Sequence, residues 1–212
     1  MTRALAVTPI HLPAAEIGRR QARYDRLAPP GLRIELRDVG PAAPGALDTE
    51  DAVRASEKEV AAALEREAAG AGFDLAFPDC VLDPAVPDGA AEPGGPPVHG
   101  LLKLSATYLA ARGERFGAVV RNQAIGAELA RRLSAYGLER HVAGVAVMDL
   151  PFDAIADTGA WNAALAEAVG ALAGRGATAV INGCSAVDVE PADLPARVVD
   201  PTELALGLMV AS

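Results

Sequence analysis

The sequence predicts an α/β protein of two small lobes, each a short parallel sheet flanked by helices. Short apolar runs alternate with helical patterns along 212 residues, as expected for parallel strands joined by crossover helices. A Pro/Gly-rich stretch at 84–97 separates two such halves. Hydrophobic residues make up 51% of the chain and aromatic residues only 4%. Much of the apolar fraction is alanine, which suits helices packed closely on a sheet.

The first half begins with a β-like run, followed by a helix for which Pro13 suits the first turn. The next strand alternates apolar and charged residues. The second helix has Asp48 or Thr49 as a cap, acidic residues in its first turn and Gly70 at its end. A brief apolar run then leads to the first cysteine. These elements are expected at 4–8, 13–27, 32–39, 48–70 and 73–78.

The second half repeats the alternation and ends in a helix whose start, Asp200-Pro201 with Glu203, resembles a capping box. Helices are expected at 101–113, 122–137, 160–176 and 201–211, and strands at 116–121, 142–148, 177–182 and 196–200. The predicted lobes are 1–98, completed by a C-terminal helix within 200–212, and 99–199.

Charge and hydropathy exclude several classes of function. The net charge is -9 and no run of basic residues occurs, so the electrostatic surface of a nucleic-acid binder is missing. No apolar run approaches 18 residues and no signal peptide is recognisable, which predicts a cytoplasmic protein without a membrane partner. In that compartment Cys80 and Cys184 are expected to be free thiols.

Each of the two cysteines directly follows a predicted buried strand, Cys80 in "PDCVLDP" and Cys184 in "NGCSAV". Ligands of parallel α/β sheets bind at this carboxyl edge of the strands. A thiolate and a thiol that face each other can remove a proton from one face of a carbon acid and return one to the other. The alternative is that each cysteine serves as a small buried hydrophobic residue.

Three segments together resemble the aspartate/glutamate/hydantoin racemase superfamily, most closely its hydantoin-racemase-like branch: "FDLAFPDCVLDPAV", "RFGAVV" and "ATAVINGCSAVD". In that branch a strand ends in a cysteine three residues ahead of an Asp-Pro pair, matched by Cys80 with Asp83-Pro84. A later strand ends in Gly-Cys and a small residue, matched by Gly183-Cys184-Ser185. The resemblance implies two pseudo-symmetric lobes with the active site in the cleft between them. It also implies that Cys80 and Cys184 act as acid and base without a cofactor.

The sequence departs from the family at two loops that bear on the substrate. An Asn-rich loop after the first strand is replaced by Thr8-Pro9, from which Thr8 still offers a hydroxyl donor. Hydantoin racemases carry threonines where this chain has Arg121-Asn122. Arg121 is therefore either a clamp for a carboxylate or an exposed arginine at a helix start, and Asn122 is by default an N-cap.

Residues beside the cysteines complete the expected substrate contacts: Val81, Gly183 and Ser185. Asp79 could accept a hydrogen bond from a substrate N–H, although a structural role in the turn is preferred. The Pro/Gly-rich stretch 84–97 is expected to be a linker or a cover over the cleft.

These observations predict a racemase or epimerase that acts on a small carboxylate, amino-acid derivative or cyclic amide. The substrate is expected to be anionic, and self-association is left open. The superfamily also holds decarboxylases and cis-trans isomerases. A cysteine hydrolase that uses one thiol with His11 or His99 and a ligand-binding protein without activity are further alternatives. The histidines lack metal-ligand spacing, and no nucleotide-binding or dinucleotide-binding motif occurs, so neither a metal nor a cofactor is expected.

Overall fold

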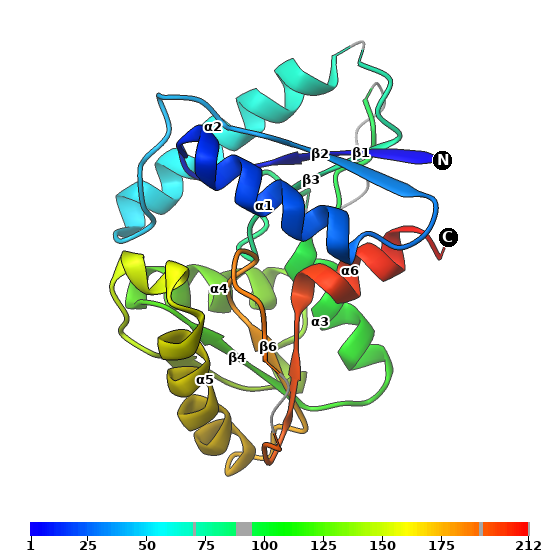
Figure 1. Cartoon of the computed structure of the whole chain (residues 1–212). Coiled ribbons are helices and arrows are strands. Elements are labelled where there is room, and N and C mark those ends of the chain that lie inside the picture. The colour runs from blue at the N-terminus through cyan, green and yellow to red at the C-terminus, as the bar shows by residue number, and fades with distance from the viewer. Residues whose placement is uncertain (70, 88–94, 191–192, 212) are drawn as a thin grey trace.

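The chain folds into two lobes, each built on a parallel sheet (Figure 1). The computed structural model describes residues 1–69, 71–87, 95–190 and 193–211. The strand order is β2-β1-β3 in the first sheet and β5-β4-β6-β7 in the second. All strand pairs are parallel. This confirms the predicted fold class.

Helices cover both faces of the first sheet, because successive residues of its central strand point to opposite sides. Ala4 and Ala6 pack in one cluster with Tyr24 of α1. Leu5 and Val7 pack in another cluster, with apolar residues of α2. The elements of this lobe are β1 (Thr2–Val7), α1 (Ala14–Leu27), β2 (Leu32–Arg37), α2 (Glu50–Ala68) and β3 (Leu75–Pro78).

The second sheet is covered in the same way. Phe116 and Ala118 of its central strand pack towards α3 and α4, whereas Val119 packs against Trp161 and its neighbours on α5. Its elements are α3 (Leu101–Ala111), β4 (Phe116–Val120), α4 (Gln123–Ala135), the 3-10 turn η1 (Glu139–His141), β5 (Val142–Val147), the 3-10 turn η2 (Phe152–Ala156), α5 (Thr158–Ala173), β6 (Ala179–Asn182), β7 (Arg197–Val199) and α6 (Pro201–Met209).

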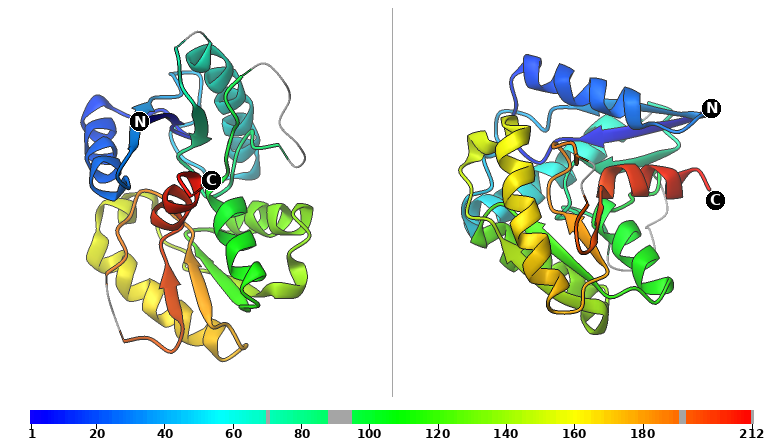
Figure 2. Two further views of the ribbon diagram at one scale, coloured as in Figure 1. Left: turned by 90° about the vertical axis from the view of Figure 1, so that its right-hand side faces the viewer. Right: turned by 60° about the horizontal axis from the view of Figure 1, so that its bottom comes forward.

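The two lobes exchange a helix. Val98 makes a parallel bridge to Ala76 beside β3, and α3, which follows it, packs on the second sheet. In return α6, which follows β7, buries Ala205 and Leu206 against the first sheet. The two exchanged helices also contact each other, and Figure 2 shows them at the junction of the lobes, α6 in red and α3 in green. The division of the chain into lobes at residues 98 and 199 remains a prediction.

The predicted elements are all found, with boundaries shifted by a few residues. Of the two predicted caps of α2, Thr49 is the N-cap and its side chain accepts a hydrogen bond from the N–H of Ala52. The sequence did not predict η2. Gly70, the expected end of the second helix, lies outside the described residues. So do residues 88–94, which form the centre of the expected linker or cover at 84–97. Among the described helices none is long and apolar enough to cross a membrane.

Asp83 ties the first cysteine segment to the start of α3. Its carboxylate accepts hydrogen bonds from the N–H groups of Leu102 and Lys103 at 3.0 and 2.7 Å, and from the Tyr136 hydroxyl at 3.0 Å. It occupies the place of an N-cap side chain, because a Cβ on the N-cap residue Gly100 would lie 2.3 Å from Asp83 Oδ2. Burial raises the pKa of Asp83 to about 6, although these hydrogen bonds oppose the shift.

Asp83 is expected to make the protein lose stability as the pH rises. Its pKa is about 6 in the folded chain and about 3.9 when unfolded. A raised pKa favours the folded state fully below the unfolded value, and this contribution is lost as the pH passes 6. The whole difference corresponds to about 3 kcal/mol, of which roughly half is lost between pH 5 and pH 7.5. Urea unfolding of wild type and Asp83→Asn at these two pH values measures that half.

Asp83→Asn should be less stable than the wild type at both pH values. The two oxygens of Asp83 accept the N–H groups of Leu102 and Lys103, whereas the amide nitrogen of Asn cannot accept a hydrogen bond. The stability advantage of the wild type should be larger at pH 5 than at pH 7.5. An advantage that is equal at both values, or larger at pH 7.5, would show that burial does not dominate the titration of Asp83.

Candidate active site

The two cysteines occupy equivalent turns at the carboxyl edges of the two sheets. The residue before each cysteine donates its N–H to the central strand, from Asp79 to Val7 O and from Gly183 to Val119 O, both at 2.7 Å. Each sulfur then accepts a hydrogen bond from the N–H two residues further on. Leu82 N lies 3.5 Å from Cys80 Sγ, and Ala186 N plays the same part for Cys184.

Gly183 is required by its distance from the central strand of the second sheet. A Cβ at this position would lie 2.3 Å from the carbonyl oxygen of Val119, so any side chain would push the turn off the sheet. The sequence predicts Gly183 as a contact of the substrate. Its contact with β4 supplies a structural reason that does not involve a ligand.

Both thiols line one pocket between the lobes, called here the inter-lobe pocket. It has about 490 Å³ of empty volume, including its open mouth. Most of the residues expected to contact the substrate line it: Pro9, Asp79, Cys80, Val81, Arg121, Gly183, Cys184 and Ser185. Thr8 and Asn122 do not belong to its lining.

The polar face of α1 holds the two cysteine turns together. Arg20 Nη1 donates to Asp79 Oδ2 at 2.9 Å, and the Tyr24 hydroxyl donates to Asp79 Oδ1 at 2.7 Å. Both carboxylate oxygens of Asp79 thus have partners on α1, and its backbone oxygen also accepts a hydrogen bond from Ser185 Oγ at 3.0 Å. Burial and the charge of Asp79 raise the pKa of Tyr24 well above its usual value, so the hydroxyl remains a donor.

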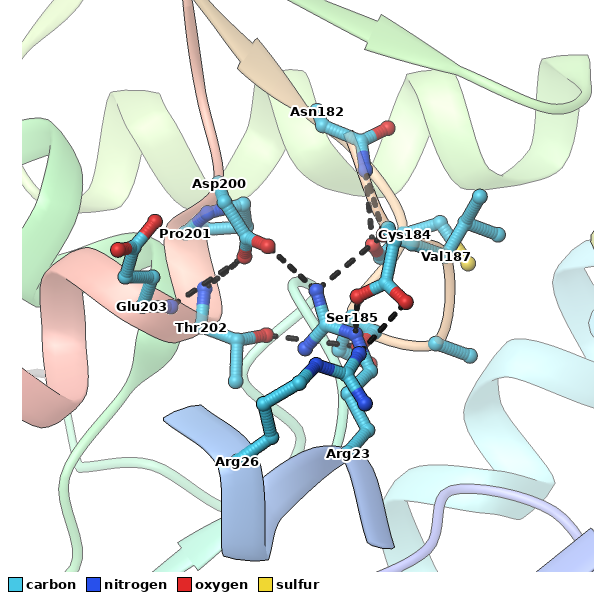
Figure 3. A network of polar contacts seen from close by, with 12 residues as sticks. Arg23, Arg26, Asn182, Cys184, Ser185, Val187, Asp200, Pro201, Thr202 and Glu203 are labelled. Atoms are coloured by element: carbon cyan, nitrogen blue, oxygen red, sulfur yellow. Dashed lines mark hydrogen bonds and ion pairs between the residues drawn. The ribbon is translucent and has the colours of Figure 1, made fainter. Parts of the chain in front are cut away.

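Further along α1, arginines reach the turn that carries Cys184 (Figure 3). Arg23 donates to Val187 O at 3.2 Å, to Asp188 at 2.9 Å and to Asp200. Because Asp200 caps α6, one guanidinium joins α1, the second cysteine turn and the exchanged helix. Arg26 also pairs with Asp188, at 2.7 Å.

The charges around the two thiols differ. Burial raises the pKa of Cys80 to about 12, and the neighbouring charges of Asp79 and Asp83 add to the shift. Burial also raises the pKa of Cys184, and the charge of Asp79 adds to this shift, but the Ala186 N–H and the charges of Arg20 and Arg23 oppose it. The sulfur of Cys184 is therefore in the more favourable environment for a thiolate.

Arg121 lies in the pocket wall and is paired. Its guanidinium donates to Asp48 and to Leu150 O and lies over the ring of Phe152. Asp48 is half exposed, with 53% of its side chain accessible. Asn122 is the N-cap of α4, since its side chain accepts from Ile125 N, and it donates to Leu47 O at 2.9 Å. Arg121 and Asn122 thus fix the segment that precedes α2.

Thr8 is committed to the loop after β2. Its hydroxyl donates to Asp38 Oδ1 at 3.3 Å and accepts from Val39 N at 3.0 Å, and the residue is fully buried. The expectation that Thr8 contacts the substrate is therefore not supported by its position. His11 Nδ1 lies 2.7 Å from the same Asp38. Neither His11 nor His99 lines the inter-lobe pocket, which leaves a cysteine hydrolase without its base there.

Sequence reasoning missed several residues of the pocket wall. Arg20 comes from α1, and the buried positions Arg20, Arg23 and Tyr24 recur at helical spacing, a signal that could have been read as an inward polar face. The remaining missed residues are apolar side chains from loops and helix starts, whose approach no local pattern reveals: Ile10, Leu47, Leu82, Ile125, Phe152, Ile155 and Ala186. Within the described ranges no three His, Cys, Asp or Glu side chains gather in a way that could hold a metal ion.

Solved structures with the same fold include two allantoin racemases. The one from Pseudomonas fluorescens is 17% identical, with a TM-score of 0.82 over 99% of this chain and 90% of that chain. The one from Klebsiella pneumoniae is 20% identical, with a TM-score of 0.77 over 100% of this chain and 87% of that chain. An aspartate racemase homologue from Pyrococcus horikoshii is 14% identical, with a TM-score of 0.61 over 100% and 98% of the two chains.

No curated protein matches the sequence. The model of the family described as Asp/Glu/Hydantoin racemase matches residues 19–209. This match includes both cysteine turns, the exchanged helices and the polar face of α1 from Arg19 onwards. Because it spans nearly the whole chain, the protein belongs to the Asp/Glu/hydantoin racemase family.

Proposed function

We propose that the protein is a cofactor-independent racemase or epimerase of hydantoin-type cyclic amides, with Cys80 and Cys184 as its acid and base. The observation that carries this proposal is that both thiols line one pocket. The similarity in fold to two allantoin racemases supports the choice of substrate class.

In this mechanism the acidic carbon of the substrate lies between the two sulfurs. One thiolate removes the proton, and the electron pair of the C–H bond moves into the adjacent carbonyl group to form an enolate. The opposite thiol then donates its proton to the other face of the carbon and becomes a thiolate. The configuration is inverted, and no atoms are gained or lost except the exchanged proton.

Cys184 is the thiolate that begins the cycle, because the charges of Arg20 and Arg23 favour its ionised form. Cys80 begins as the acid, since burial and the charges of Asp79 and Asp83 keep its proton bound. The N–H groups of Val81 and Ser185 are suitable donors to the enolate oxygen. Both residues line the pocket, and in the described part of the chain neither N–H has a hydrogen-bond partner.

The charge balance of the wall favours a neutral ring over a dicarboxylate. Arg20 is paired with Asp79 and Arg121 with Asp48, so each cation among the described wall residues is already compensated. Most of the remaining wall is apolar. An anionic substrate would compete with these acids for the guanidinium groups, although Arg121 Nε has no hydrogen-bond partner among the described residues, whereas a cyclic amide can use backbone donors. We therefore replace the expectation of an anionic substrate with that of a neutral one.

Replacement of either cysteine should abolish turnover. Cys80→Ala and Cys184→Ala each remove one of two groups that act on opposite faces, so racemisation should fall by at least about 10³-fold. Enantiopure allantoin and 5-substituted hydantoins are incubated in D₂O with each protein. Chiral chromatography measures inversion, and mass spectrometry measures deuterium at the stereocentre.

Gly170→Ala in α5 is the matched control, because a Cβ there meets no atom within 4 Å, and it should retain full activity. Racemisation that persists in both cysteine variants would exclude the two-thiol mechanism. Release of a ring-opened acid instead of inversion would assign a hydrolase, and release of CO₂ from a 2-substituted malonate assayed in parallel would assign a decarboxylase.

The rate should rise with pH throughout the neutral range. The pKa of Cys184 is raised above its usual value by burial, so only a small fraction is thiolate at pH 7, and this fraction grows about tenfold per pH unit. Cys80 remains protonated, since its pKa is about 12. The measurement is kcat/KM for inversion between pH 6 and 9. A rate that is constant between pH 6 and 8 would contradict a thiolate base in this environment.

A further inference from the structure

Cys80 lines a second, smaller cavity in addition to the inter-lobe pocket. A water-sized sphere has about 10 Å³ of room in this cavity, against about 60 Å³ in the inter-lobe pocket on the same measure. The room in the cavity is close to what one water molecule needs. Cys80, Leu47 and Leu82 line both spaces, so the Cys80 side chain lies in the wall between them. The other residues around the small cavity are polar as well as apolar and include Ser56, Glu57 and Arg132.

The small cavity in turn adjoins a groove on the surface between α2 and α4. Val53, Glu57 and Glu128 line both the cavity and the groove. A buried guanidinium lies between these two acids. Arg132 Nη2 pairs with Glu57 on α2, and Arg132 Nε donates to Glu128 on α4 at 2.9 Å. The side chain of Arg132 is only 5% exposed, whereas that of Glu57 is 39% exposed.

We propose that this cavity and the Glu57–Arg132–Glu128 cluster form a proton route between Cys80 and the solvent, separate from the substrate pocket. The proposal rests on the function proposed above. One inversion leaves the proton on Cys184 and a thiolate at Cys80, the reverse of the starting state. A water molecule in the cavity, held by Ser56 and the acids, gives a proton to Cys80 and is reprotonated from the surface through Glu57. Cys184 releases its proton to water in the inter-lobe pocket after the product leaves.

Such a route has a reason in the geometry of the site. A bound ring separates the two sulfurs and excludes water from between them, so the thiols cannot exchange a proton directly. Cys80 is also the sulfur whose environment most disfavours a lasting negative charge, with Asp79 before it and Asp83 after it. A supply of protons from behind Cys80 neutralises its thiolate while the product still occupies the pocket, so that only the release of the proton from Cys184 waits for the pocket to empty.

The test measures exchange at Cys80 without any substrate. The chain has two cysteines, so in Cys184→Phe the only S–H stretching band in the infrared spectrum belongs to Cys80, and the phenyl ring occupies the inter-lobe pocket. The protein is mixed into D₂O and the conversion of S–H to S–D is followed. Exchange should continue in this protein. Adding Val53→Ile, which fills the cavity, should slow it about tenfold.

Glu57→Gln in the same background should also slow exchange, because an amide cannot take up and release the proton. Glu65→Gln, an exposed acid on the same helix, is the control and should have no effect. Cys184→Leu serves as the background if the Phe variant does not fold. Equal exchange rates in the Val53→Ile, Glu57→Gln and Glu65→Gln proteins would overturn the proposal. Because no turnover is measured, this outcome is distinct from failure of the racemase assignment.

Discussion

The geometry of this site depends on one buried carboxylate. The carboxylate of Asp79 accepts hydrogen bonds from Arg20 and Tyr24 of α1. Its backbone oxygen accepts a hydrogen bond from Ser185 of the other lobe. Removing one partner from a buried ion pair costs about 3–5 kcal/mol, whereas the intact pair contributes little net stability. The network therefore acts mainly by fixing positions. It sets the place of Cys80 relative to α1, and the arginines of α1 set the place of the Cys184 turn relative to the same helix.

The same network explains why two chemically identical groups can differ in their readiness to ionise. Pseudo-symmetry gives each sulfur the same strand end and the same N–H contact from two residues ahead. The difference comes from the charged neighbours: the cations Arg20 and Arg23 of α1 oppose the rise in the pKa of Cys184, whereas Asp79 and Asp83, which flank Cys80 in the chain, add to the rise in the pKa of Cys80. Racemisation needs a group that can act as acid or base on each face of the carbon, and one of the two must begin as the base.

The sequence was sufficient for features that depend on neighbours along the chain. Alternating strands and helices, the caps at Thr49, Asn122 and Asp200, and the position of each cysteine after a buried strand follow from local pattern. Contacts made across the lobes were not predictable in this way. Thr8 looked like a free donor because its partner Asp38 is 30 residues away. Arg121 looked like a free cation because its partner Asp48 belongs to the other lobe. The short turn η2 was missed because its residues show no helical periodicity.

The exchanged helices delay the folding of the first lobe during synthesis of the chain. One face of the first sheet, with Ala4, Ala6 and Phe77, is covered partly by Ala205, Leu206 and Met209, which are translated almost 130 residues after β3. Domains usually fold as units, with the N-terminal one first. Here the N-terminal lobe must wait on the ribosome with apolar surface exposed until α6 emerges. A nascent chain of this architecture thus keeps apolar surface of its first lobe exposed until almost all of the second lobe has been made.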